Sequence, residues 1–140
     1  MAVYAYFPIF HSSLGVTVQR LPPEVEKTLA KYQEVEAQLA SVMTQKGTVI
    51  SYIKEIERAL GILKDLPSDA VVYRSTGHVL VKVSKDDAVK DLEGKKEELE
   101  IRLTSLERME SILKKQLEEL RSALSKYMKT ATEPRKEEEE

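Results

Sequence analysis

The chain has 140 residues, of which 41% are hydrophobic and 33% are charged, and its net charge is −2. This length allows one ordinary domain, and a near-neutral chain lacks the basic excess typical of nucleic-acid-binding domains. The absence of cysteine excludes disulfides, a thiol nucleophile and a cysteine-ligated metal. No stretch approaches the ~18 to 20 apolar residues of a membrane span, and the N-terminus lacks the positive region of a signal peptide. We therefore expect a cytoplasmic protein that binds neither nucleic acid nor membrane.

Proline positions divide the chain into segments. No proline lies between Pro23 and Pro67, or from there to the C-terminal tail, so each interval can hold a long helix. Proline is favoured in the first turn of a helix, where its missing N–H costs nothing, and Pro67 suits a helix stop. We predict helices over about residues 22–65 and 86–130, separated by a β-hairpin over about residues 69–84.

Both predicted helices carry mostly apolar residues at alternating intervals of three and four. An average spacing of 3.5 residues is typical of a left-handed coiled coil. In the first helix the series is Val25, Thr28, Tyr32, Val35, Leu39, Val42, Lys46, Val49, Ile53, Ile56, Leu60 and Leu63. In the second helix it is Val89, Leu92, Lys96, Leu99, Leu103, Leu106, Glu110, Leu113, Leu117, Leu120, Leu124 and Tyr127. Two successive helices of matching length indicate a mainly α fold, a long antiparallel two-helix coiled coil.

Three charged residues, Lys46, Lys96 and Glu110, interrupt these series. Matching the series at their connected ends places Leu63 beside Val89, and Lys46 then lies about one helical turn from Glu110. One interpretation is that the two charges pair and help to fix the register of the helices. The other is that each side chain extends to solvent.

The segment between the helices alternates with period two and is rich in valine, which is typical of β-strands. We predict strands over residues 70–75 and 78–84, joined by a tight turn over residues 75–78 in which Gly77 supplies a positive φ. The two faces of this hairpin carry Val72, Val79, Val81 and Val83 with Arg74, and Val71, Tyr73 and Leu80 with Lys82.

Both faces of the predicted hairpin are largely apolar, and a single hairpin cannot bury both. An isolated two-stranded hairpin is marginally stable in water, and its open edges favour pairing with other strands. The pattern therefore predicts that hairpins from several chains join in a sheet or an oligomeric β-barrel.

No pattern typical of an active site is present. The chain has no glycine-rich phosphate loop, and its two histidines, His11 and His78, lie in unrelated settings. Its many carboxylates fall on amphipathic helices, where they normally form the solvated face. We predict no catalytic activity, no cofactor and no metal site.

The ends of the helices far from the hairpin offer another kind of site. Apolar side chains at the end of a coiled coil are partly exposed, and exposed apolar patches often mark binding sites. Ordinary packing of the terminal turns is the alternative, and the residues alone leave both open. The residues are Leu21, Val25, Leu29 and Tyr32 from the first helix and Leu120, Leu124, Tyr127 and Met128 from the second.

The connecting sequence LPSDAVVYR, residues 66–74, followed by Gly77 and by LVK at residues 80–82, resembles the β-type subunit of prefoldin in an archaeal-like form. The similarity extends from Leu21 to about Leu124. The heptads alone would fit many coiled coils, so the hairpin segment carries the resemblance. Its single hairpin distinguishes the β type from the α type, which has two.

This resemblance implies an ATP-independent molecular chaperone. Prefoldins are hexamers of two α-type and four β-type subunits, whose hairpins form a double β-barrel. Their coiled-coil tips hold unfolded or nascent polypeptides for delivery to a group II chaperonin. Carried over to this chain, the assembly residues are Val71, Val72, Tyr73, Val79, Leu80 and Val81. The client-binding residues are Leu21, Val25, Leu29, Leu120, Leu124, Tyr127 and Met128. A coiled-coil adaptor or spacer that binds folded partners is the alternative function.

Two terminal segments flank the expected coiled-coil and hairpin domain, residues 21–132. Family members begin near Leu21, so residues 1–20 are either a misassigned start or an apolar arm that enlarges the client surface. Residues 133–140 carry five acidic and two basic side chains, and we expect this tail to be disordered by its charge.

Overall fold

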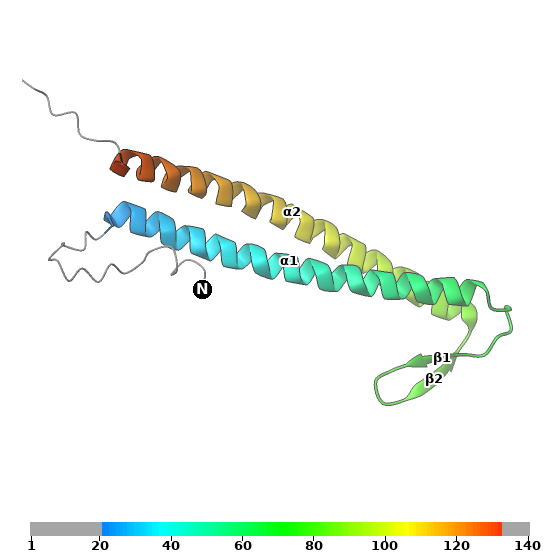
Figure 1. Ribbon diagram of the computed structural model, residues 1–140. Coiled ribbons are helices and arrows are strands. Elements are labelled where there is room, and N and C mark those ends of the chain that lie inside the picture. Colours follow the sequence, from blue (N-terminus) through cyan, green and yellow to red (C-terminus); the bar gives the residue numbers. More distant parts are fainter. Residues whose placement is uncertain (1–20, 133–140) are drawn as a thin grey trace, which may run out of the picture.

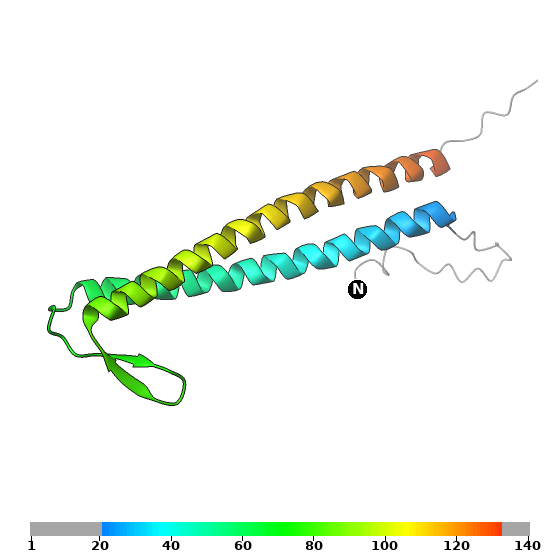
Figure 2. The same ribbon diagram turned by 180° about the vertical axis from the view of Figure 1, so that it is seen from behind.

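In the computed structural model, which describes residues 21–132, two long helices run side by side and a small hairpin projects from one end (Figure 1). The elements are α1 (Pro23–Lys64), β1 (Val72–Ser75), β2 (Leu80–Val83) and α2 (Lys85–Thr132). The view from behind shows the hairpin at the end where the chain passes from α1 to α2, with the other end open (Figure 2). The predicted mainly α fold is confirmed. The expectations for residues 1–20 and 133–140 lie outside the described residues.

The first helix begins at the prolines, as predicted. Pro23 occupies the first helical turn, and the carbonyl oxygen of Pro22 accepts hydrogen bonds from the N–H groups of Val25 and Glu26 at 2.9 and 3.0 Å. Acidic side chains in this first turn complement the positive end of the helix. The helix ends at Lys64, just before the Leu66-Pro67 pair, so its predicted bounds are correct to within one residue.

The second helix begins with a side-chain cap. The Ser84 hydroxyl accepts a hydrogen bond from the Asp87 N–H at 3.1 Å, which satisfies one of the unpaired donors of the first turn. The next residue, Lys85, donates from its Nζ to the Leu66 carbonyl oxygen at 2.6 Å. This hydrogen bond ties the beginning of α2 to the segment that leaves α1, and so closes the base of the hairpin.

The two helices pack along the predicted seam. Every residue of the two sequence series is buried or half-buried, and Val35 is only 1% exposed. The deepest positions on α1 recur every seven residues, as expected for the side of a coiled coil that faces its partner. The central cluster consists of Val35, Val42, Val49, Ile53, Leu106 and Leu113.

The register of the helices agrees with the expected pairing to within about one turn. Val42 and Leu113 lie together beneath one groove of the coiled coil. At the hairpin end, Leu63 lines the same cleft as Ala88 and Leu92, where the sequence placed it beside Val89. The antiparallel arrangement therefore brings the start of α1 and the end of α2 to the same free end.

Candidate interaction surfaces

The hairpin turn is centred on Gly77 and His78. Thr76 donates to the Val79 carbonyl oxygen from its N–H at 2.9 Å and from its hydroxyl at 3.0 Å. Gly77 has φ 93°, a conformation that glycine adopts without steric cost. The sequence placed the turn one residue earlier, with Thr76 and Gly77 at its centre, and that placement is wrong.

The strands are also shorter than predicted, with four residues in each. Tyr73 pairs with Lys82 and Arg74 with Val81. Moving the turn by one residue shifts the register by two, and side chains alternate between faces with period two. The predicted composition of each face is therefore correct although the turn is not.

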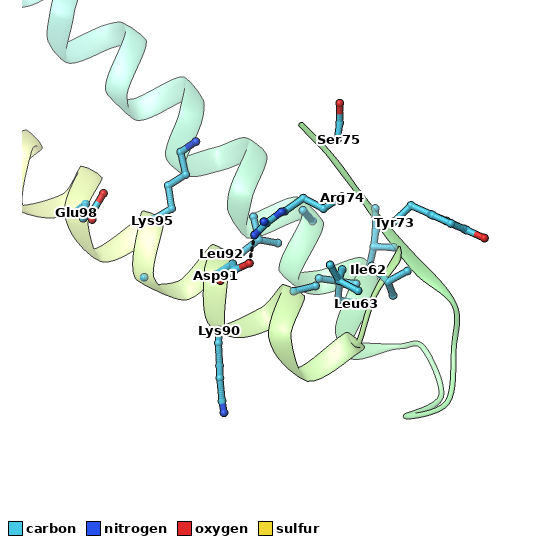
Figure 3. Close-up of a pocket in the computed structure, with 15 residues that line it drawn as sticks. Ile62, Leu63, Tyr73, Arg74, Ser75, Lys90, Asp91, Leu92, Lys95 and Glu98 are labelled. Carbon is cyan, nitrogen blue, oxygen red and sulfur yellow. Dashed lines mark hydrogen bonds and ion pairs between the residues drawn. The ribbon is translucent and has the colours of Figure 1, made fainter. Parts of the chain in front are cut away.

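One face of the hairpin lies over its own helices. Val72 and Val83 on this face are half-buried, and Arg74 reaches α2, where its guanidinium pairs with the Asp91 carboxylate. Figure 3 shows Arg74 pointing toward Asp91 and Tyr73 pointing away from the helices. Asp91 lies on a different element, so the sequence analysis missed this pair.

Between the hairpin and the helices lies an open cleft of about 930 Å³ (Figure 3). The Arg74–Asp91 pair crosses it, but apolar side chains form much of its wall. The hairpin therefore covers its own helices only in part. The apolar residues are Ala59, Ile62, Leu63, Val72, Val83, Ala88 and Leu92.

The rest of the hairpin is exposed in the described chain. Leu80 is 68% exposed and Tyr73 60%, on the face that points away from the helices. The sheet has two strands, so within residues 21–132 each strand has one neighbour and one open edge. The predicted assembly residues lie together here, although Val72 is half-covered by the helices while Val71, Tyr73, Val79, Leu80 and Val81 are exposed.

The free end of the coiled coil is less well packed than its middle. The central cluster of deeply buried residues begins at Val35 on α1 and ends at Leu113 on α2. Toward the free end, beyond Val35 and Leu113, the seam residues are half-buried. Met128 there is 54% exposed. The other predicted client-binding residues are half-buried: Leu21, Val25, Leu29, Leu120, Leu124 and Tyr127.

Two of the three seam charges, Lys46 and Glu110, form an ion pair. Lys46 Nζ lies 2.9 Å from Glu110 Oε2, and Lys114 Nζ lies 2.7 Å from Glu110 Oε1. The hydrogen bonds from Lys114 and Lys46 lower the pKa of Glu110 to about 2, and the hydrogen bond to Glu110 raises the pKa of Lys46. Of the two sequence interpretations, pairing is confirmed.

Within residues 21–132, no group of three or more histidine, aspartate or glutamate side chains is placed to hold a metal ion. Neither α1 nor α2 contains a stretch with the length and hydropathy of a membrane span. Two apolar surfaces stand out among the described residues: the exposed hairpin, with its open strand edges, and the incompletely packed free end.

Comparison with known proteins assigns this architecture to a class. The family model described as prefoldin subunit matches residues 26–131. The chain belongs to the prefoldin family, whose members are subunits of molecular chaperones.

Within that family the chain is similar to beta subunits. It is 39% identical over 113 residues to prefoldin subunit beta of Sulfolobus acidocaldarius, covering 78% of this chain and 90% of that protein. It is 38% identical over 115 residues to prefoldin subunit beta of Thermococcus kodakarensis, covering 82% and 98%. Its structure is similar to the prefoldin beta subunit from Thermococcus strain KS-1, with a TM-score of 0.72, 39% identity and 83% and 98% coverage. The resemblance found in the hairpin sequence is confirmed.

Proposed function

We propose that this chain is a subunit of an ATP-independent holdase, which shields apolar segments of unfolded or nascent polypeptides at the free ends of its coiled coils. The hairpin supplies the base of the assembly. One observation carries this proposal. Apolar surface is incompletely buried at both ends of the coiled coil, on the exposed hairpin at one end and along the incompletely packed seam at the other.

The hairpin surface supports the assembly role. Tyr73 and Leu80 expose most of their surface on one face, and burial of such side chains contributes roughly 1.5–3 kcal/mol each. The unpaired strand edges beside them can add backbone hydrogen bonds with another strand. A hairpin from another subunit would both cover this apolar face and pair with an open strand edge.

The free end supports the client-binding role. Its apolar residues are spread over two helices and are only half-buried or exposed, and methionine and aromatic side chains adapt to varied apolar partners. Each contact is weak. Several free ends held by one base would bind a long unfolded chain at many points, and the combined affinity would exceed that of any single end.

The family resemblance supplies the finer proposals. We place the chain in a cytoplasmic hexamer with two α-type and four β-type subunits, which delivers its clients to a group II chaperonin. Neither the binding of clients nor their delivery requires a cofactor.

The client-binding role is tested by polar substitutions at the free end. Leu29→Gln, Leu124→Gln and Met128→Gln together remove apolar surface while keeping residues of good helix propensity. We expect the assembled triple variant to require a roughly tenfold higher concentration to suppress aggregation of unrelated denatured proteins. Light scattering measures the suppression, with circular dichroism and size measurement showing that helices and assembly are retained.

The matched control combines Met43→Gln with Ile101→Gln, at side chains that are 50% and 66% exposed away from the free end. This control should suppress aggregation as the unmodified chain does. Equal activity of the triple variant would exclude the free end as the client site. Binding of one folded partner without suppression of aggregation would instead support the adaptor alternative.

A further inference from the structure

The two flanks of the coiled coil differ in chemistry at mid-length. One flank carries the ion pairs around Glu110, together with Glu107 and Ser111. Met109 and Gln116 lie two residues beyond Glu107 and Lys114, and residues two apart on a helix point about 200° apart. They therefore belong to the opposite flank.

This opposite flank contains a groove of about 410 Å³. Val42 and Leu113, 4% and 8% exposed, are its buried members, and Met109 and Ile112 beside them are 48% and 52% exposed. None of its lining residues is charged, whereas flanking positions of a coiled coil usually carry glutamate or lysine. We call this the uncharged groove, lined by Gln38, Ser41, Val42, Gln45, Met109, Ile112, Leu113 and Gln116.

We propose that the uncharged groove binds a short extended segment of an unfolded polypeptide, as a second contact for the client held at the free end. This inference rests on the proposed holdase function and adds a contact site to it. The groove would bind segments that combine apolar side chains with backbone groups that have no hydrogen-bond partner.

The chemistry of the groove matches an extended backbone. The Gln45 amide nitrogen donates to the Ser41 hydroxyl at 3.3 Å, and the Gln38 amide nitrogen donates to Glu34 at 3.3 Å. These bonds leave the two amide oxygens as acceptors beside apolar surface. An extended segment supplies backbone N–H donors together with alternating apolar side chains, while a folded protein has already paired most of its backbone groups.

The size of the groove favours a short segment over a second copy of this chain. Gln38 and Gln45 are seven residues apart, or ~10 Å along the helix, which is the length of about three extended residues. A stable protein interface buries about 800 Å² on each partner. Toward the free end the uncharged surface stops at the Lys31–Glu34 ion pair and at Glu119.

One client can reach both sites. Pro23 and Gln38 are fifteen positions apart on α1, which corresponds to ~22 Å, and about seven extended residues cover that distance. A polypeptide held at the free end therefore presents a neighbouring segment to the groove at high effective concentration.

The test uses charged substitutions in the assembled chaperone. Met109→Glu and Ile112→Glu place charge in the groove at exposed helical positions. We expect each to weaken binding of a fluorescently labelled, chemically unfolded protein roughly tenfold, the effect of losing one buried apolar contact. Met43→Glu and Ile101→Glu, 50% and 66% exposed and outside the groove, should bind as the unmodified chain does.

Client length provides an independent readout. A short apolar peptide that fills only the free end should bind all four variants equally, because it cannot span to the groove. Equal binding of the long client by groove and control variants would overturn the inference while leaving the holdase function intact. A change in assembly mass caused by Met109→Glu or Ile112→Glu would also overturn it, since the groove would then be a subunit contact. Failure of the unmodified chaperone to bind any unfolded protein would overturn the proposed function itself.

Discussion

At the scale of single residues, the seam of the coiled coil holds an ionic cluster around Glu110 among its apolar side chains, apart from the ion pairs that Lys96 makes with Glu57 and Glu100. Glu110 is 8% exposed, and both of its carboxylate oxygens are paired with lysines. Removing one partner from such a pair leaves an uncompensated charge. Because Lys46 and Glu110 lie on different helices, a shift of one helix along the other would separate them. The cluster therefore favours one register over its alternatives.

The pKa of Glu110 gives this cluster a pH dependence. Its folded-state pKa is about 2, below the usual value of 4.5, so the ionised form stabilises the folded state. This contribution is fully present above pH 4.5 and is lost as pH falls toward 2. We expect Glu110→Gln to lower Tm at neutral pH and to flatten the pH dependence of Tm between pH 4.5 and 2.

Thermal unfolding followed by circular dichroism across this range measures both effects. Glu97→Gln is the control, since Glu97 is exposed on the same helix and lies outside the cluster around Glu110. An identical pH dependence in the two variants would show that the cluster contributes nothing specific.

At the scale of the elements, the ion pair of Arg74 and Asp91 links the hairpin to α2, beside the half-buried Val72 and Val83. The two charged side chains are about half exposed, at 54% and 51%, so the pair contributes at most ~1 kcal/mol to global stability. Its effect is local, because it joins β1 to the first turns of α2. We expect the pair to fix the orientation of the hairpin over the helices.

A charge swap tests this positioning role. We expect Arg74→Asp to raise amide hydrogen exchange of residues 72–83 by roughly twofold to fivefold, and Arg74→Asp with Asp91→Arg to restore protection. Lys82→Asp, on the other hairpin face, is the control. It should leave the amide hydrogen exchange of these residues unchanged without a second substitution. Failure of the double variant to restore protection would mean that the ion pair does not position the hairpin.

The elements also show which structural features can be predicted from the sequence. Proline positions and heptads were sufficient for both helices, because those signals are local and repeated. The turn was placed one residue too early, because a glycine can supply positive φ at either central position of a tight turn. The Arg74–Asp91 pair and the uncharged groove depend on how separate elements pack, and no local pattern in the sequence contains that information.

At the scale of the whole molecule, the chain carries two apolar surfaces that the length of the coiled coil separates. The hairpin exposes apolar strands at one end, and the seam is incompletely packed at the other. The central claim is that the first surface assembles the complex and the second holds clients. A substitution on the hairpin should therefore dissociate the complex without unfolding the helices.

The most direct measurement is the solution mass of Leu80→Glu, for the chain alone and with an α-type prefoldin subunit. Leu80 and the control residue Ile101 are 68% and 66% exposed, so neither substitution disturbs the chain's own core. A charge buried between strands weakens association by roughly 100-fold or more. We predict that Leu80→Glu falls to single-chain mass with its helical content unchanged, while Ile101→Glu assembles as the unmodified chain does. A Leu80→Glu complex of unchanged mass would contradict the account.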